Sequence, residues 1–167
     1  MGQNNLKLGD LIVYCTATKK FVRIRNYIKI KGKTKWLIPI AIYCFDGISL
    51  YLKDFKGLNW YDSIFKVSKI KIKNVPKINF FVGDEITLKK LVKHKYILND
   101  CMQKLSDKYS IECDFLSDFT WLWSSTEFEY SFNIARGVSV NNGDVCSDSK
   151  SCSSIHNRVR AFAALNV

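Results

Sequence analysis

The sequence predicts one α+β domain with antiparallel strands first, helices in the middle, and short strands with long polar loops last. Strand-like apolar runs occupy residues 1–80, helical spacing occupies 81–113, and residues 114–167 are rich in Ser, Asn and turn signals. The chain has 167 residues, of which 47% are hydrophobic and 14% aromatic, which suffices for one sizeable core. We therefore expect a single domain over residues 1–167, with a β-rich basic half, a helical segment and a C-terminal module.

The first eighty residues carry most of the predicted strands. Residues 11–16 form a dense apolar run and residues 21–30 alternate loosely. Residues 36–45 are typical of a buried strand, and the turn Asp46-Gly47 that follows predicts a hairpin with residues 48–52.

A further run, Lys69-Ile70-Lys71-Ile72-Lys73, alternates with a period of two residues. This pattern predicts a strand that buries the isoleucines and exposes the lysines. Exposed lysines also protect the edge of a sheet from unwanted pairing. Between this run and the hairpin, residues 58–65 predict a turn or a short helix.

Two helices are expected in the middle of the chain. Asp84 and Glu85 suit the start of a helix, whose apolar face would consist of Ile86, Leu88, Leu91 and Val92. A second helix, roughly residues 99–109, would place Met102, Leu105 and Tyr109 on one face.

Short strands are expected to close the chain. Residues 137–140 and 141–145 predict two strands around a turn at Asn142-Gly143-Asp144. Residues 158–163 alternate and predict a closing strand.

The positive charge is concentrated in the first part of the chain. Residues 1–100 contain 20 Lys and Arg against 7 Asp and Glu, whereas residues 101–167 contain 6 against 8. A basic face suits nucleic acid, an anionic cell surface or an acidic protein, or it is simply a solvated surface. Only five of the 26 basic residues are Arg, and no nucleic-acid-binding signature is present, so we expect no nucleic-acid partner.

Neither a membrane nor an export signal is expected. No apolar stretch reaches the roughly 18 residues that a membrane-spanning helix needs. Residues 1–10 have neither the basic start nor the apolar run of a signal peptide.

The cysteine and histidine pattern argues against metal and cofactor sites. The six cysteines include no C-x-x-C pair, and Cys15 and Cys44 lie in apolar runs typical of core thiols. Cys146 and Cys152 lie in a polar stretch and could bridge a loop in oxidising surroundings. His94 and His156 are isolated, so we expect no metal.

Catalysis is not expected either. Cys146 and Cys152 have no basic or metal neighbours in sequence that would lower a thiol pKa. Asp148, Ser154 and His156 lie in one loop without an element that would position them as a triad.

The segment Trp121–Glu127, WLWSSTE, predicts a structural role in the C-terminal module. The two Trp rings alternate around Leu122, so we predict that Trp123 is buried. The hydroxyls can satisfy backbone groups at an irregular turn, and Glu127 is expected to pair with Arg158 or Arg160. Contact with a ligand stays open as an alternative for this set: Trp121, Trp123, Ser124, Ser125, Thr126, Glu127, Arg158 and Arg160.

WLWSSTE, together with Asn133-Ile134-Ala135, Gly137 and Arg158–Phe162 (RVRAF), resembles the C-terminal module of C-type-lectin-like proteins from gut bacteria and their tailed phages. These proteins belong to the formylglycine-generating-enzyme-like superfamily. The N-terminal part is similar in weaker ways, at Gly9-Asp10, Ile38–Tyr43, Ser49–Asp54 and Leu58–Trp60. The family's Y-L-P-S-x-x-E-L helix segment is missing between Asp84 and Asp118.

The resemblance implies a C-type-lectin-like fold and a non-enzymatic structural protein of a phage virion. Such a protein would be a head fibre, a tail fibre or a capsid decoration component that attaches to the host surface. A bacterial lectin-like adhesin and a catalytic relative of the formylglycine-generating enzymes are the alternatives. The expected partners are other virion proteins or further copies of the chain, and a host-surface glycan or protein.

Two surfaces are predicted for these partners. Loops rich in Ser, Asn and aromatic residues suit ligand binding. The candidates there are Phe128, Glu129, Tyr130, Ser131, Phe132, Asn141, Asn142, Ser147, Ser149, Ser153, Ile155, His156 and Asn157. Lys69, Lys71 and Lys73 are the predicted assembly surface.

Overall fold

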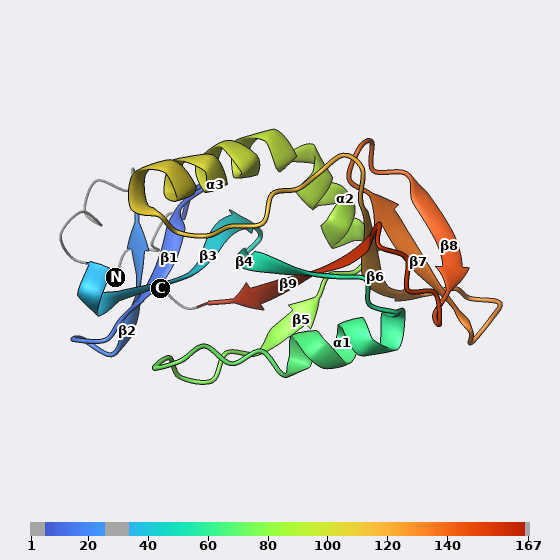
Figure 1. Cartoon of the computed structure of the whole chain (residues 1–167), viewed down its shortest axis with the longest axis horizontal. Helices are drawn as coiled ribbons and strands as arrows, with labels where there is room; N and C mark the ends of the chain where they lie inside the picture. Colours follow the sequence, from blue (N-terminus) through green and yellow to red (C-terminus); the bar gives the residue numbers. More distant parts are fainter. Residues whose placement is uncertain (1–5, 26–33, 166–167) are drawn as a thin grey trace.

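One mixed β-sheet runs through the molecule, with helices on two sides of it (Figure 1). The computed structural model describes residues 6–25 and 34–165. Within these residues the strands are β1 (Leu11–Cys15), β2 (Lys20–Ile24), β3 (Leu37–Phe45), β4 (Ile48–Lys56), β5 (Phe80–Val82), β6 (Trp121–Glu127), β7 (Ile134–Ser139), β8 (Val145–Ser149) and β9 (Asn157–Ala164). The helices are α1 (Trp60–Ser68), α2 (Glu85–Lys93) and α3 (Lys95–Tyr109), with a 3-10 turn η2 at Thr34–Trp36.

The predicted α+β, C-type-lectin-like fold class is wrong. The molecule is a mostly-sheet domain with 38% strand and 23% helix, and its nine described strands all belong to one sheet. The sequence pattern suggested separate strand regions on either side of a helical middle. The two regions are instead continuous, because β9 lies between β4 from the first region and β6 from the last.

Strand β9 is the centre of this sheet. It pairs antiparallel with β4 from Arg158 to Ala164, for example Leu50 with Phe162, and its residues 161–163 also pair with the short strand β5. Its first residues pair in parallel with β6, with Asn157 opposite Trp121. The full order is β2-β1-β3-β4-β9-β6-β7-β8. Residues 158–163 therefore do form a strand, but an interior one.

The predicted hairpin is confirmed. Strands β3 and β4 pair antiparallel, and both residues of the turn have positive φ, 49° at Asp46 and 77° at Gly47. Strand β3 begins at Leu37, after η2, and β4 continues to Lys56. Strand β2 ends at Ile24, and residues 26–30 of the predicted second strand lie outside the described residues.

The predicted strand Lys69–Lys73 is wrong, because this segment is a loop between α1 and β5. The predicted alternation of burial is nevertheless present, since Ile70 and Ile72 are half-buried and the lysines are exposed. No strand runs alongside it in the described part of the chain, and Asn74 turns it with a φ of 63°. The period-two pattern therefore comes from packing on one side only.

The helices agree with the predicted positions in part. Asp84 caps α2 by accepting a hydrogen bond from the Thr87 amide at 2.7 Å. Leu88, Leu91 and Val92 are buried, but Ile86, expected on the same face, is 66% exposed. Helix α3 is longer than expected, and residues 58–65 contain the start of α1, which Asn59 caps.

Two hydrophobic clusters lie on opposite sides of the sheet. Strand β9 contributes to both, since Phe162 packs in the cluster with α2 and α3, while Ala161 and Ala163 pack in the cluster with α1 and β5. This is the two-residue alternation of a strand covered on both faces. No helix in the described residues is long and apolar enough to cross a membrane.

Candidate functional site

The WLWSSTE segment forms β6 and holds the start of α2. The predicted burial of Trp123 is confirmed at 2% exposure, and its indole N–H donates to the Leu58 carbonyl at 3.1 Å. The Ser125 amide donates to the Gly83 carbonyl at 2.9 Å, and the Thr126 hydroxyl accepts from the Glu85 amide at 3.0 Å. Ser124 is fully buried and its hydroxyl accepts from the Thr126 amide. These contacts support the structural role that the sequence predicted.

The predicted pairing of Glu127 with Arg158 or Arg160 is wrong. Arg158 instead pairs with Asp54 at 2.7 Å, and Arg160 donates to the Asp114 carbonyl. Parallel pairing places Arg158 beside Leu122, five residues from Glu127 along β6, which corresponds to about 16 Å. Burial lowers the pKa of Arg160, an effect that the charges of Asp54 and Asp114 oppose.

Glu127 pairs with Lys150, the residue that follows β8. The Lys150 side chain is 5% exposed, and its Nζ lies 2.5 Å from a Glu127 carboxylate oxygen. The same nitrogen lies 4.4 Å from the ring centroid of Trp60 and 5.7 Å from that of Tyr61, within cation–π range. A buried ammonium between two rings and a carboxylate is well compensated for its lost hydration.

The backbone of Lys150 connects the same segments. Its amide donates to the Asn133 carbonyl at 2.8 Å, and its carbonyl accepts from the Trp60 amide at 2.9 Å. One residue thus joins the first turn of α1, the loop between β6 and β7, and the loop between β8 and β9. Lys150 is not among the residues predicted from the sequence. The available signal was that it is the one lysine between residues 109 and 167, set in a Ser-rich stretch.

Exposed aromatic rings lie beside this junction. Tyr130 is 85% exposed, Phe132 is 91% exposed, and Tyr61 on α1 is 52% exposed. The Tyr130 ring packs edge-on against the Phe128 ring, with 5.6 Å between the ring centroids. The Arg136 guanidinium lies over the same Phe128 ring, 5.6 Å from its centroid. We call the surface formed by Tyr130 and Phe132, in the loop between β6 and β7, the aromatic face.

The structure divides the predicted ligand-binding residues between two ends of β6. Pairing of Ile134 with Ser149 brings one group to the aromatic face: Phe128, Glu129, Tyr130, Ser131, Phe132, Ser147 and Ser149. The other group lies at the Trp121 end, about 20 Å away along the strand: Asn141, Asn142, Ile155, His156 and Asn157. Ser153 lies in the loop that connects the two ends. Because of this separation, these residues do not form one site with the aromatic face. Asn157 is also buried, whereas Asn141 and Asn142 are exposed.

The predicted bridge in the polar stretch after β7 is not formed, since Cys146 and Cys152 are both free thiols. Burial raises the pKa of Cys146, and it raises the pKa of Cys44 to about 12 and that of Cys113 to about 11. Within residues 6–25 and 34–165, no cluster of three or more His, Cys, Asp or Glu side chains is placed to hold a metal ion.

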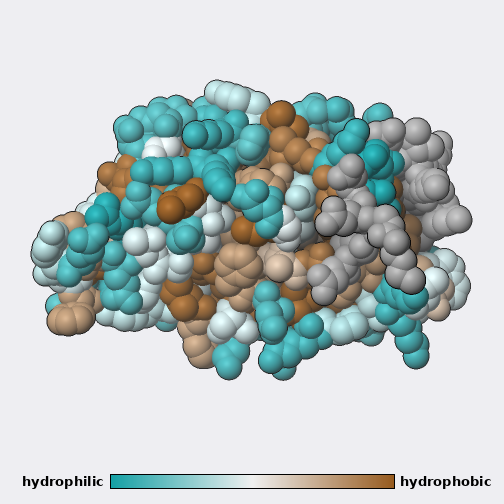
Figure 2. Space-filling view, turned by 180° about the vertical axis from the view of Figure 1, so that it is seen from behind, coloured by the Kyte–Doolittle hydropathy of each residue, from teal (hydrophilic) through white to brown (hydrophobic). Residues whose placement is uncertain are grey.

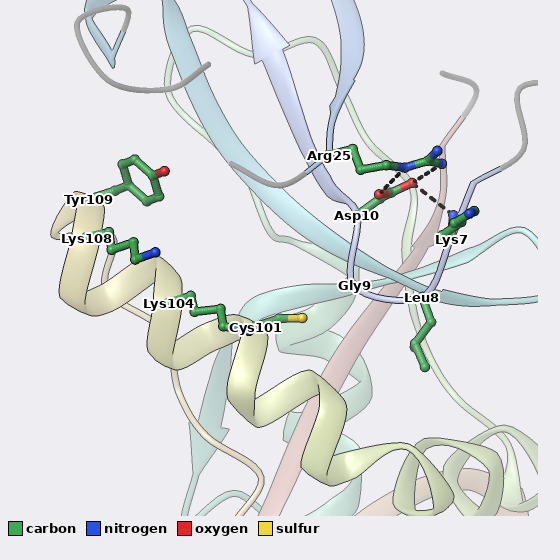
Figure 3. Close-up of a pocket in the computed structure, with 9 residues that line it drawn as sticks. All are labelled: Lys7, Leu8, Gly9, Asp10, Arg25, Cys101, Lys104, Lys108 and Tyr109. Carbon is green, nitrogen blue, oxygen red and sulfur yellow. Dashed lines mark hydrogen bonds and ion pairs between the residues drawn. The ribbon is translucent and has the colours of Figure 1, made fainter. Parts of the chain in front are cut away.

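A basic cleft of about 620 Å³ lies between α3 and the residues around the start of β1 (Figure 3). Lys104, Lys108 and Tyr109 extend from α3 on one side, and Asp10 and Arg25 face each other on the other. The buried Asp10 carboxylate accepts from Arg25 at 3.2 Å, and Lys104 pairs with Asp100 at 2.5 Å. Arg25 and Lys104 are thus already paired with carboxylates. The positive charge that the cleft still offers to an anion comes from Lys7 and Lys108. Its residues come from distant segments, so no local sequence pattern marked it.

A second cavity of about 700 Å³ is lined by residues 68–80. It carries the three lysines of the predicted assembly surface, Lys69, Lys71 and Lys73, around an apolar floor.

No protein-family model matches the chain, and no curated protein matches it.

Proposed function

We propose that the protein is a non-enzymatic attachment protein that binds a host-surface glycan through the aromatic face. The observation that carries this proposal is the Lys150 junction, which fixes two loops so that they present Tyr130 and Phe132 to solvent. Large rings exposed on loops that a rigid scaffold holds are typical of binding surfaces. They contribute contact area with little loss of side-chain freedom.

A glycan suits this surface better than a flat apolar partner. The two loops that the Lys150 junction joins also carry hydroxyl and amide side chains, among them Ser131, Asn133 and Ser151. A sugar offers apolar C–H faces for ring contacts and hydroxyls for hydrogen bonds to such groups. A host-surface protein is the other class of ligand, and the binding experiment below separates the two.

The setting that we propose is the virion of a phage, as a head fibre, tail fibre or capsid decoration component. Its support is the resemblance of WLWSSTE and RVRAF to segments of phage and gut-bacterial surface proteins. The genes that flank the coding sequence test this setting. Capsid and tail genes on either side would support it, and metabolic genes would oppose it.

A glycan array tests the binding proposal. The parent protein should bind a subset of printed bacterial surface polysaccharides, and the double variant Tyr130→Ser, Phe132→Ser should lose that binding while melting like the parent. The matched control is Phe119→Ser, since Phe119 is also 85% exposed but precedes β6 at its other end. Equal glycan binding by the parent and the double variant would contradict the glycan proposal. So would binding to host cells that protease treatment abolishes, with no binding to any printed glycan.

A further inference from the structure

The loop between α1 and β5 forms a groove of its own. Figure 1 shows this segment running out from the end of α1 along the lower side of the molecule and returning to β5. The cavity of about 700 Å³ is lined by residues 68–80, including Ile70, Ile72, Val75 and Ile78. We call this segment and its cavity the lysine groove.

The floor of the lysine groove is apolar. The four aliphatic side chains are only partly buried, and they pack against the cluster that contains Phe80 and Val67. In Figure 2, brown apolar surface lies above hydrophilic side chains that project from the lower edge of the molecule. The aliphatic side chains of the groove are half-buried whereas its lysines are exposed, so the apolar surface lies deeper than the lysines.

The rim of the lysine groove is uniformly basic. Lys69, Lys71, Lys73 and Lys77 line it, and no described lining residue is acidic. Lys69 lies over the Phe65 ring at 5.3 Å, and in the described residues the other three lysines have no ion-pair partner. Four neighbouring cations without a carboxylate create a local field that favours an anionic partner.

Part of the backbone of the groove is also unpaired. The amides of Lys71, Ile72 and Lys73 donate no hydrogen bond to a described residue. The side chains of Lys71 and Ile72 are exposed and half-buried in turn, and a turn follows at Lys73 and Asn74, where the Val75 amide donates to the Ile72 carbonyl at 3.2 Å. The open amides on this segment are available to hydrogen-bond the main chain of another protein.

Three other occupants fit less well. Nucleic acid favours Arg forks and exposed stacking rings, whereas this groove offers Lys above aliphatic side chains. A membrane surface requires apolar side chains that protrude, whereas these are recessed beneath lysines. A second copy of the groove would place lysine against lysine, which disfavours self-pairing.

We propose that the lysine groove binds an extended segment of another protein in which acidic and aliphatic residues alternate. The aliphatic side chains occupy the cavity, the carboxylates pair with Lys71, Lys73 and Lys77, and the main chain hydrogen-bonds to the open amides. This inference does not depend on glycan binding, because it concerns a different surface. In a virion, the segment would belong to a neighbouring subunit.

A synthetic peptide, acetyl-GELELELEG-amide with a fluorescent label, tests the inference by anisotropy. It should bind the full chain, whereas GKLKLKLKG, with reversed charge, and GESESESEG, without aliphatic side chains, should bind at least about tenfold more weakly. The double variant Lys71→Glu, Lys73→Glu should weaken binding about tenfold or more, since two pairings become repulsions.

The matched control is Lys93→Glu, Lys108→Glu, which changes the net charge equally at exposed positions on α2 and α3. It should bind the acidic peptide like the parent, and both variants should melt as one transition. If the control variant lost as much affinity for the acidic peptide as Lys71→Glu, Lys73→Glu, or if GESESESEG bound as tightly as GELELELEG, net charge alone would explain the binding. Either result would overturn the inference. Binding to phosphatidylglycerol vesicles without binding to the peptide would also overturn it, in favour of a lipid surface. The assay contains no glycan, so its failure is distinct from failure of the attachment proposal.

Discussion

Gly9 shows how one residue decides the approach between a strand and a helix. It precedes β1 with a φ of 88°, and a Cβ added there would lie 2.6 Å from the Cys101 Sγ on α3. Both the backbone conformation and the close contact require glycine. The basic cleft of Figure 3 takes its shape from this contact, since Gly9 and Cys101 both line it.

Gly9→Ala should therefore lower the free energy of unfolding by about 1–3 kcal/mol for backbone strain, with a further loss from the clash. Gly47→Ala is the control, because Gly47 also has positive φ but no atom within 4 Å of the added Cβ. Urea unfolding should show a larger loss for Gly9→Ala, and Cys101→Ala in the same chain should restore part of it. Equal losses for the two single variants would show that the contact does not matter.

Trp123 is the largest ring buried in the WLWSSTE segment. Trp123→Ala should cost about 3–5 kcal/mol, as expected for a cavity left by a large buried side chain, plus the loss of its hydrogen bond to Leu58. Trp36→Ala should cost far less, because Trp36 is 52% exposed. Thermal melting followed by circular dichroism measures both, and similar melting temperatures would refute the structural role.

At the scale of elements, the ion pair between Asp54 and Arg158 joins β4 to β9. The Asp54 side chain is 1% exposed and that of Arg158 is 20% exposed. Arg158→Ala would leave a buried carboxylate unpaired and should destabilise the fold by about 3–5 kcal/mol. Glu127→Gln should cost less than Arg158→Ala, because the Glu127 side chain is 53% exposed and the Gln amide oxygen can still accept a hydrogen bond from the buried Lys150 ammonium. Chemical denaturation that gives the opposite order would show that the Glu127 pair is the more important one.

The start of α2 gives a prediction about pH. The hydrogen bond from Thr87 holds the pKa of the Asp84 carboxyl below its ordinary value. A lowered folded-state pKa means that the stabilisation is present above the unfolded pKa, near 3.8, and is lost as the pH falls through the folded value. Asp84→Ala should cost about 1 kcal/mol at neutral pH, and the difference from the parent should shrink at acidic pH. Unfolding measured across this range would contradict the cap if the difference stayed constant.

Local patterns predicted the elements that local physics determines. The hairpin of β3 and β4 was predictable because Asp46-Gly47 accepts positive φ, and the start of α2 because Asp84 caps it. The run Lys69–Lys73 misled because one packed side produces the same alternation as a paired strand.

Contacts between distant segments could not be predicted. Lys150 contacts Trp60 and Glu127, which lie 90 and 23 residues away, and no local pattern marks those pairs. The interior place of β9 depends on pairing with β4, more than a hundred residues earlier. The same lack of long-range information led to the wrong partner for Glu127 and to the wrong fold class.

At the scale of the whole molecule, two clusters share one sheet. Leu98 belongs to the cluster on the α3 side and Val159 to the cluster on the α1 side, and both pack on strands of the same sheet. We expect one cooperative unfolding transition, because both clusters pack on the same sheet and neither can unfold while the sheet stays intact. Leu98→Ala and Val159→Ala should each shift tryptophan fluorescence and far-ultraviolet circular dichroism together. A variant that separates the two signals would show two independent units.

The interior position of β9 also has a consequence during synthesis. The ribosome makes β1–β4 and β6–β8 first, and the strand that unites them, residues 157–164, comes after all of them. Until then β4, β5 and β6 each lack β9, the strand that they pair with, and apolar side chains flank their open edges. Such edges are prone to association with neighbouring chains. Association with other copies is therefore expected to be greatest before residues 157–164 have left the ribosome, because only after that can the sheet close.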